Sequence, residues 1–328
     1  MCAIEQIKSY NWRMKKEFKR GEKLSKGDKI GVVATAAPLE EQRLEQGLKV
    51  IQERGFEVVM PLRASRDYGN LSHGWSNGSV IERYQSLKKL LLDSEVKAII
   101  AARGGYGTAQ MMSLLNAELF SSNPKPIIGV SDVTQLMCYQ TLHAGVCSVH
   151  GPSIGASLAD AKTCEDSLQD TNDIFEALCN PDFKPSYSCK PLREGSAKGH
   201  IIAANLSILL TMLGTPWDID YSNSILVVED VGESPYKIHR ALSQLSYAGK
   251  FDSLSGLVFG RFSKCDSKHG PQIEDVFSMV LDDVLSEISF PVYSDLQMGH
   301  WGRNVPLGLG CMAELSEGSL KMLEGIVK

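Results

Sequence analysis

Features that define several large classes of protein are missing from this sequence of 328 residues. It contains no run of eighteen or more apolar residues, which excludes a membrane-spanning helix. The seven histidines show neither H-x-x-x-H nor H-E-x-x-H spacing, and G-x-G-x-x-G and G-x-x-x-x-G-K-[ST] are also missing. The sequence therefore predicts no metal site and no nucleotide cofactor.

Excess positive charge is missing as well. The 34 Lys and Arg residues are outnumbered by 39 Asp and Glu residues, and the formal net charge is -5. This balance argues against a partner that is a nucleic-acid polymer, because such binding rests on neutralising many phosphates.

The eight cysteines are scattered and include no C-x-x-C pair. In a chain of this length, that pattern favours reduced, mostly buried thiols over a disulfide framework. The N-terminus also lacks the apolar middle part of a secretory signal, so we expect a cytoplasmic protein. Residues 1–25 are polar and basic, and they are predicted to form a loosely held surface extension.

The length and the pattern of apolar residues predict two domains. Residues 26–160 alternate strands, at 30–34, 56–60, 96–101 and 126–130, with helices over 44–51, 80–91 and 133–142. This alternation predicts an α/β domain with a parallel sheet. Residues 161–198 are polar and are interpreted as a connector that contains a helix ending near residue 178, followed by three prolines. Residues 199–328 predict a mixed α+β domain with a terminal hairpin that turns at residues 316–318.

The most informative segment is G-V-S-D at residues 129–132, where a predicted strand runs directly into a predicted helix. This order resembles the nucleophile elbow, a tight turn that projects a serine hydroxyl, here that of Ser131, above the edge of the sheet. The second glycine of G-x-S-x-G is replaced by Val133. On this motif alone, a Ser-Asp helix cap is the favoured interpretation.

A glycine-rich strand end, R-G-G-Y-G at residues 103–107, follows the predicted strand at 96–101. Glycines let a ligand approach the backbone closely. The loop is therefore interpreted as an anion nest, a simple tight turn, or the wall of an oxyanion hole beside Ser131.

A serine nucleophile needs a base and a group that orients it. Glu229 and Asp230 end an apolar strand, and His300 lies between glycines after the predicted strand at 291–296. Such residues are more often caps or structural groups, and sequence spacing alone does not join them to Ser131.

Taken together and in order, these stretches resemble the LD-carboxypeptidase family, serine peptidases that include muramoyltetrapeptide carboxypeptidases and microcin C immunity proteins. The matching stretches are residues 27–30, 37–38, 96–99, 103–107, 128–134, 150–152, 205–206, 213–217, 226–230 and 299–300. The resemblance extends from about residue 26 to the C-terminus. A series of motifs in the family's order is far more specific than any one of them.

The resemblance implies a triad in the chain order Ser, Glu, His, without a metal or other cofactor. Ser131 is then the nucleophile, His300 the general base, and Glu229 the acid that orients His300. Backbone N–H groups of Asp132 and Gly105 would hold the oxyanion. The residues expected to bind substrate are Arg103, Gly104, Tyr106 and Asn205. A homodimer is a further expectation from the family.

The expected activity is hydrolysis of an L,D-amide bond at the C-terminus of a peptidoglycan-derived peptide, as in murein tetrapeptide recycling. The family often has Gly-Gly before Asn-Leu, whereas this chain has Ala203 and Ala204. The microcin branch uses aromatic stacking on a nucleotide. The absence of tryptophan between Trp75 and Trp217 favours the cell-wall branch, although Phe183 and Tyr187 are available. The alternatives are a peptidyl-nucleotide hydrolase of the microcin C type that gives antibiotic immunity, and a non-catalytic protein that binds an anion or a sugar.

Overall fold

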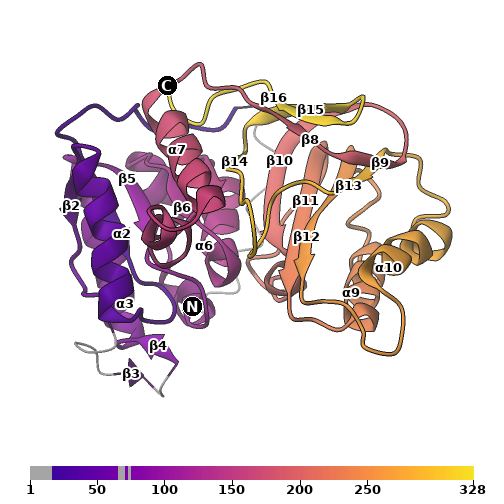
Figure 1. Cartoon of the computed structure of the whole chain (residues 1–328), viewed down its shortest axis with the longest axis horizontal. Coiled ribbons are helices and arrows are strands. Elements are labelled where there is room, and N and C mark those ends of the chain that lie inside the picture. The colour runs from indigo at the N-terminus through magenta and orange to yellow at the C-terminus, as the bar shows by residue number, and fades with distance from the viewer. Residues whose placement is uncertain (1–16, 66–70, 73–74) are drawn as a thin grey trace, which may run out of the picture.

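The computed structural model describes residues 17–65, 71–72 and 75–328, which form two main β-sheets that lie side by side (Figure 1). The first sheet has the order β14-β7-β6-β5-β1-β2. Its neighbours are parallel except for β14, which is antiparallel to β7. Its strands are β1 (Lys29–Val33), β2 (Glu57–Val59), β5 (Val96–Ala101), β6 (Ile127–Gly129), β7 (Ser148–His150) and β14 (Leu307–Leu309). The predicted N-terminal α/β domain with a parallel sheet is confirmed.

Helices connect the parallel strands of the first sheet, as the sequence pattern predicts. Leu44, Leu48 and Ile51 are buried on one face of α2 (Glu41–Glu53), and Gly55 follows its end with a positive φ of 88°. α3 (Val80–Leu92) begins with a capping box in which Ser79 and Glu82 satisfy each other's backbone N–H groups. The remaining segments are α4 (Thr108–Met111), η1 (Met112–Leu114), α5 (Ala117–Ser122), η2 (Ser131–Val133), α6 (Thr134–Cys138), η3 (Tyr139–His143) and η4 (Ile154–Leu158). A two-stranded ribbon, β3 (Leu71–Ser72) and β4 (Ser76–Asn77), precedes α3.

The second sheet is mixed, with the order β8-β16-β15-β10-β11-β12-β13-β9. Its central strands β10 to β13 are parallel, and antiparallel strands lie on both sides of them. The strands are β8 (Ser186–Ser188), β9 (Lys190–Arg193), β10 (Ala197–Asn205), β11 (Ser224–Val231), β12 (Gly256–Ser263), β13 (Val292–Ser294), β15 (Met312–Ser316) and β16 (Ser319–Met322). The helical segments are α8 (Leu206–Leu210), α9 (Pro235–Tyr247), α10 (Ile273–Met279) and η5 (Val280–Val284). The predicted mixed C-terminal domain and its terminal hairpin are confirmed.

Seven of the described strands lie outside the parts of the chain for which the sequence indicated strands: β3, β4, β7, β8, β9, β10 and β14. The polar segment 161–198, interpreted as a connector, holds α7 (Glu165–Cys179) and also supplies β8 and β9 to the second sheet. β14 comes from the C-terminal part of the chain but joins the first sheet. The buried apolar side chains of both sheets form one continuous cluster.

The predicted loose extension falls largely on residues 1–16, which lie outside the described residues. Within 17–25, Lys19 pairs with Val146, Gly21 pairs with Val327, and the Leu24 side chain is buried. This stretch is therefore held against the segment before β7 and against the C-terminus rather than loosely attached.

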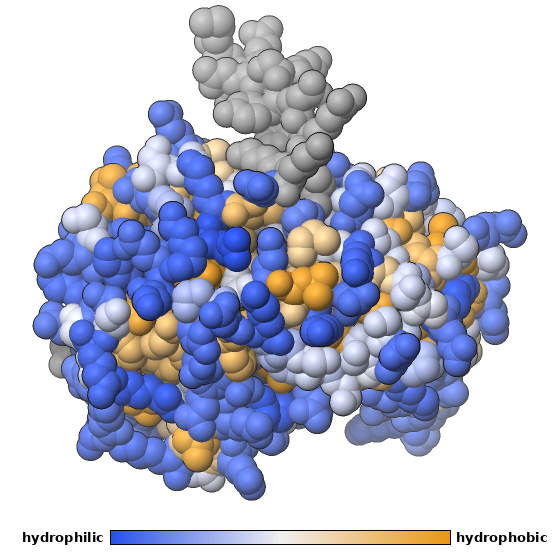
Figure 2. Space-filling model, turned by 90° about the horizontal axis from the view of Figure 1, so that it is seen from above, coloured by the Kyte–Doolittle hydropathy of each residue, from blue (hydrophilic) through white to orange (hydrophobic). Residues whose placement is uncertain are grey.

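No helix within the described part of the chain is long and apolar enough to cross a lipid bilayer. Figure 2 shows the face seen from above, where the hydrophobic residues that it colours lie in small separate groups among hydrophilic ones. Scattered groups of this kind are usual on a protein exposed to water.

Candidate active site

The turn at Ser131 connects β6 to η2 and α6 through a strained backbone. Ser131 has a φ of +64°, a conformation that non-glycine residues seldom adopt and that tends to be kept at functional sites. A Cβ on Gly129 would lie 2.7 Å from Cγ1 of Val133, so only glycine allows the helix to start this close to the strand. The turn has the backbone character of a nucleophile elbow without the motif's second glycine.

The glycine-rich loop at residues 103–107 packs directly against this turn. A Cβ on Gly104 would lie 2.7 Å from Cβ and 3.0 Å from Oγ of Ser131, while one on Gly105 would lie 2.6 Å from Cβ of Ala37. The loop therefore approaches the serine more closely than a residue with a side chain would allow.

Alanine at position 104 is expected to lower kcat about tenfold or more without unfolding the protein. The new methyl group would push the Ser131 side chain from its position, and catalysis is sensitive to shifts of this size. Gly151→Ala is the matched control, because its Cβ would meet its nearest neighbours at 3.6 Å, which is ordinary contact. Steady-state kinetics and thermal melting of both variants check this, and wild-type kcat in folded Gly104→Ala would contradict it.

A buried carboxylate and a histidine meet at the end of the second sheet. Oε2 of Glu229, in β11, lies 2.6 Å from Nδ1 of His300, which follows β13. Glu229 is fully buried, and its Oε1 accepts a hydrogen bond from Asn205 at 3.2 Å. Burial alone would lower the pKa of His300, but the hydrogen bond and the charge of Glu229 outweigh it, and the pKa is raised. For Glu229, burial has the opposite effect and raises the pKa, while the hydrogen bond to His300 opposes the rise.

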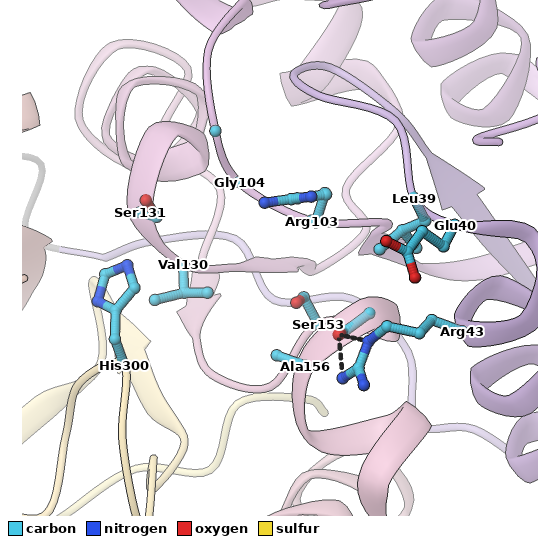
Figure 3. Close-up of a pocket in the computed structure, with 12 residues that line it drawn as sticks. Leu39, Glu40, Arg43, Arg103, Gly104, Val130, Ser131, Ser153, Ala156 and His300 are labelled. Carbon is cyan, nitrogen blue, oxygen red and sulfur yellow. Dashed lines mark hydrogen bonds between the residues drawn. The ribbon is translucent and has the colours of Figure 1, made fainter. Parts of the chain in front are cut away.

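Ser131 and His300 line the same pocket, although they follow strands of different sheets. The pocket has a volume of about 270 Å³, and Figure 3 shows both side chains at one end of it. Its other lining residues are Leu39, Glu40, Arg43, Arg103, Gly104, Gly105, Val130, Ser153, Gly155 and Ala156. The fold therefore brings the candidate nucleophile to the candidate base, which sequence spacing alone does not do.

Two buried charged side chains support the glycine-rich loop from beneath. Oδ2 of Asp132 accepts a hydrogen bond from the backbone N–H of Thr108 at 2.9 Å. Arg83 donates to the carbonyl oxygens of Gly78 and Gly107 at 2.7 and 3.3 Å. Burial raises the pKa of Asp132, and the bonds from Thr108 oppose the rise. The Asp132 side chain thus fastens the loop to the turn, while its backbone N–H directly follows Ser131.

The residues predicted to bind substrate are not all in the pocket. Arg103 and Gly104 line it, and Nη1 of Arg103 donates to the carbonyl oxygen of Pro38 at 3.5 Å. Asn205 is buried beneath Glu229 and is not a lining residue. Tyr106 is 47% exposed and makes an edge contact with the ring of Trp75, with 6.2 Å between the ring centroids.

The wall opposite Arg103 was not predicted from the sequence. It is formed by η4 and the residues just before it, and Arg43 braces it by donating to the carbonyl oxygen of Gly155 and to Asp160. The family motif at residues 150–152 lies just before this wall, and it was the feature of the sequence that could have indicated the wall. Within the described ranges 17–65, 71–72 and 75–328, no group of three or more His, Cys, Asp or Glu residues is arranged to hold a metal ion.

Solved structures place the fold among α/β proteins with two sheets of this kind. A muramoyltetrapeptide carboxypeptidase from Oxalobacter formigenes superimposes with a TM-score of 0.80 and 27% identity, covering 91% of this chain and 99% of that chain. The microcin C7 self-immunity protein MccF, in complex with aspartyl sulfamoyl adenosine, gives a TM-score of 0.83 at 21% identity, covering 94% and 99%. The second likeness concerns the fold alone.

Comparison of the sequence with family models identifies the family. The model of the LD-carboxypeptidase N-terminal domain matches residues 30–151, and that of the C-terminal domain matches residues 198–315. A putative carboxypeptidase of Synechocystis sp. (strain ATCC 27184 / PCC 6803 / Kazusa) is 34% identical over 301 residues, which cover 92% of this chain and 95% of the relative. The chain belongs to the LD-carboxypeptidase family, as the motifs indicated.

Proposed function

We propose that the protein is a serine carboxypeptidase that hydrolyses the amide bond between an L-centre and a terminal D-amino acid in a peptidoglycan-derived peptide. The observation that carries this proposal is the shared pocket, which holds Ser131 on its strained turn and His300 with Glu229 behind it. Family membership and the muramoyltetrapeptide carboxypeptidase relative support the substrate class. A cytoplasmic location and a homodimer remain predictions.

In the proposed first step, His300 takes the proton of the Ser131 hydroxyl through Nε2 while Oγ attacks the carbonyl carbon. Glu229 keeps the Nδ1 proton of His300 in place and stabilises the imidazolium that forms. Backbone N–H groups of Asp132 and Gly105 are the proposed donors to the oxyanion. His300 then gives the proton to the departing amine as the C–N bond breaks. Water hydrolyses the acyl-enzyme, again with His300 as base.

Asn205 is proposed to orient Glu229 rather than to bind substrate. Its Nδ2 donates to Glu229 at 3.2 Å and to Asp230 at 3.1 Å, while its Oδ1 accepts from the backbone of Ile208. With these bonds, Asn205 fixes the rotamer of a carboxylate that is fully removed from water.

Amidation of the substrate's terminal carboxylate is expected to lower kcat/KM about tenfold or more. A carboxypeptidase must recognise that carboxylate, and Arg103 in the pocket offers a charge-assisted bond worth about 1.5–3 kcal/mol. Paired kinetics on the free acid and the amide check this, and equal kcat/KM values would reject recognition of the terminal carboxylate. If the wild type prefers the free acid and Arg103→Ala keeps that preference, recognition of the carboxylate stands and only the proposed role of Arg103 is wrong.

The peptidyl-nucleotide alternative requires an aromatic surface near the serine. Phe183 and Tyr187, the aromatic residues noted in the connector, line a separate cavity of about 500 Å³. The Tyr187 hydroxyl donates to the carbonyl oxygen of Pro306. Their placement removes these two rings as a stacking surface beside Ser131.

Product analysis by mass spectrometry tests the proposal against both alternatives. Wild-type protein should release D-alanine from a murein tetrapeptide and leave the isomer with a terminal L-alanine intact. Cleavage of a peptidyl-nucleotide but not of the muropeptide would favour the immunity function. Binding of the muropeptide without cleavage would favour the non-catalytic binding protein.

A further inference from the structure

The segment that carries His300 is fastened to α7 by two carboxylates, Asp173 and the fully buried Asp170. Oδ1 of Asp170 accepts from Nε of Arg303 at 2.7 Å, and Oδ2 accepts from the backbone N–H of Asn304 at 2.9 Å. Asn304 in turn accepts the backbone N–H of Gly299 at 3.1 Å, which closes a loop around His300. Asp170 is fully buried, and Arg303 and Asn304 are nearly so.

The Asp170 carboxylate also contacts the segment that forms one wall of the pocket. The Ser157 hydroxyl donates to Oδ2 of Asp170 at 3.3 Å, and Ser157 belongs to η4. Gly155 and Ala156, which directly precede Ser157 in that segment, line the pocket. Asp170 therefore joins the wall of the pocket to the loop that carries His300, although these two segments are distant in the chain.

We propose that Asp170 is a positioning residue that sets the distance between His300 and Ser131. This inference rests on the proposed function, since it assumes that His300 acts on Ser131. Asp170 itself makes no contact with the reacting atoms; it acts through Arg303 and Asn304, which fix both ends of the 299–304 loop.

The arrangement suits this role because the imidazole of His300 is held on one side, by its hydrogen bond to Glu229. That bond fixes the direction of the imidazole, but the backbone of the loop sets how far the ring reaches toward Ser131. A misplacement of about 1 Å at a catalytic group can cost about 100-fold in rate. A buried ion pair with backbone contacts on both sides is stiff enough to hold such a distance.

The experiment compares Asp170→Asn with Asp218→Asn in the full chain. Asp218 is a matched control, because it also pairs with a cation, Lys250 at 2.8 Å, and accepts the backbone N–H groups of Gly214 and Ile219. Three readouts are taken on each variant: thermal stability, kcat and KM separately, and the low-field proton resonance of the short His300–Glu229 hydrogen bond.

We expect Asp170→Asn to lower kcat about 10- to 100-fold with a much smaller change in KM, and to shift or broaden the low-field resonance. Asp218→Asn should lose stability but keep kcat and the resonance. Wild-type kcat and resonance in folded Asp170→Asn would overturn the inference. If Asp170→Asn does not fold, Arg303→Lys is judged by the same criteria, since it keeps the charge but loses the two-point hold on Asp170 and Asp173.

The two proposals fail separately. Full activity in Ser131→Ala would remove the proposed function. The resonance would still report whether Asp170 holds His300, because that measurement needs no turnover.

Discussion

Replacing Ser131 by alanine is expected to lower kcat about 10³-fold or more while substrate still binds. The hydroxyl is the proposed nucleophile, whereas the pocket around it is formed by other side chains and by glycine backbone. Removing the hydroxyl therefore removes the covalent step without emptying the pocket. Steady-state kinetics on a muropeptide, together with calorimetric titration of the same peptide, separate the two effects.

Ser153 provides the matched comparison because it is the other serine that lines the pocket. Its backbone is not strained in the manner of Ser131. A loss confined to Ser131→Ala supports the assignment. An equal or greater loss in Ser153→Ala, or wild-type turnover in Ser131→Ala, would contradict it.

The rate kcat/KM is expected to rise with pH through a limb whose midpoint lies above 6.5. His300 must be neutral to accept the proton of Ser131, so activity appears as the imidazolium loses its proton. The ordinary pKa of histidine is about 6.5. Although burial lowers the pKa of His300, the bond and charge of Glu229 raise it further than burial lowers it. The limb therefore moves to higher pH than the histidine residue alone would give.

Replacing His300 by alanine should remove this limb and lower kcat about 10³-fold or more, as expected for loss of a triad base. His239→Ala is the control, because His239 also faces a carboxylate, Asp283 at 2.9 Å, but lies on α9 away from the pocket. A pH–rate profile that stays flat from about 5 to 8 in the wild type would contradict the assignment of His300 as the base. Full activity in His300→Ala would contradict it as well.

Strands β1, β2, β5 and β6 of the first sheet and the Ser131 turn could be predicted because their signals are local. A buried strand, a glycine and a serine before a helix follow one another within a few residues, and so do the strand and glycines at 96–107. Period and turn residues are sufficient for such elements. In the structure, this order of residues forms a tight turn in which Ser131 has a positive φ.

The contacts between distant segments could not be predicted from local patterns. β14 has three residues, and its place beside β7 is set by packing across more than 150 positions in the chain. Asn205 gave no local sign that its amide would bond Glu229 instead of facing a ligand. Arg83 lies on the buried side of α3 among apolar residues, and its loop contacts depend on tertiary structure. From the sequence, only the resemblance related Ser131 to Glu229 and His300; in the structure, Ser131 and His300 line one pocket and His300 bonds Glu229.

Labelling with a fluorophosphonate probe, followed by peptide mapping, tests the central claim most directly, because the probe reacts with an activated serine hydroxyl. The account predicts one modified residue, Ser131, with labelling that slows when a muropeptide is present and is largely lost in His300→Ala. Labelling of a different serine, or no labelling of a folded protein that cleaves the muropeptide, would contradict the claim that Ser131 is the nucleophile.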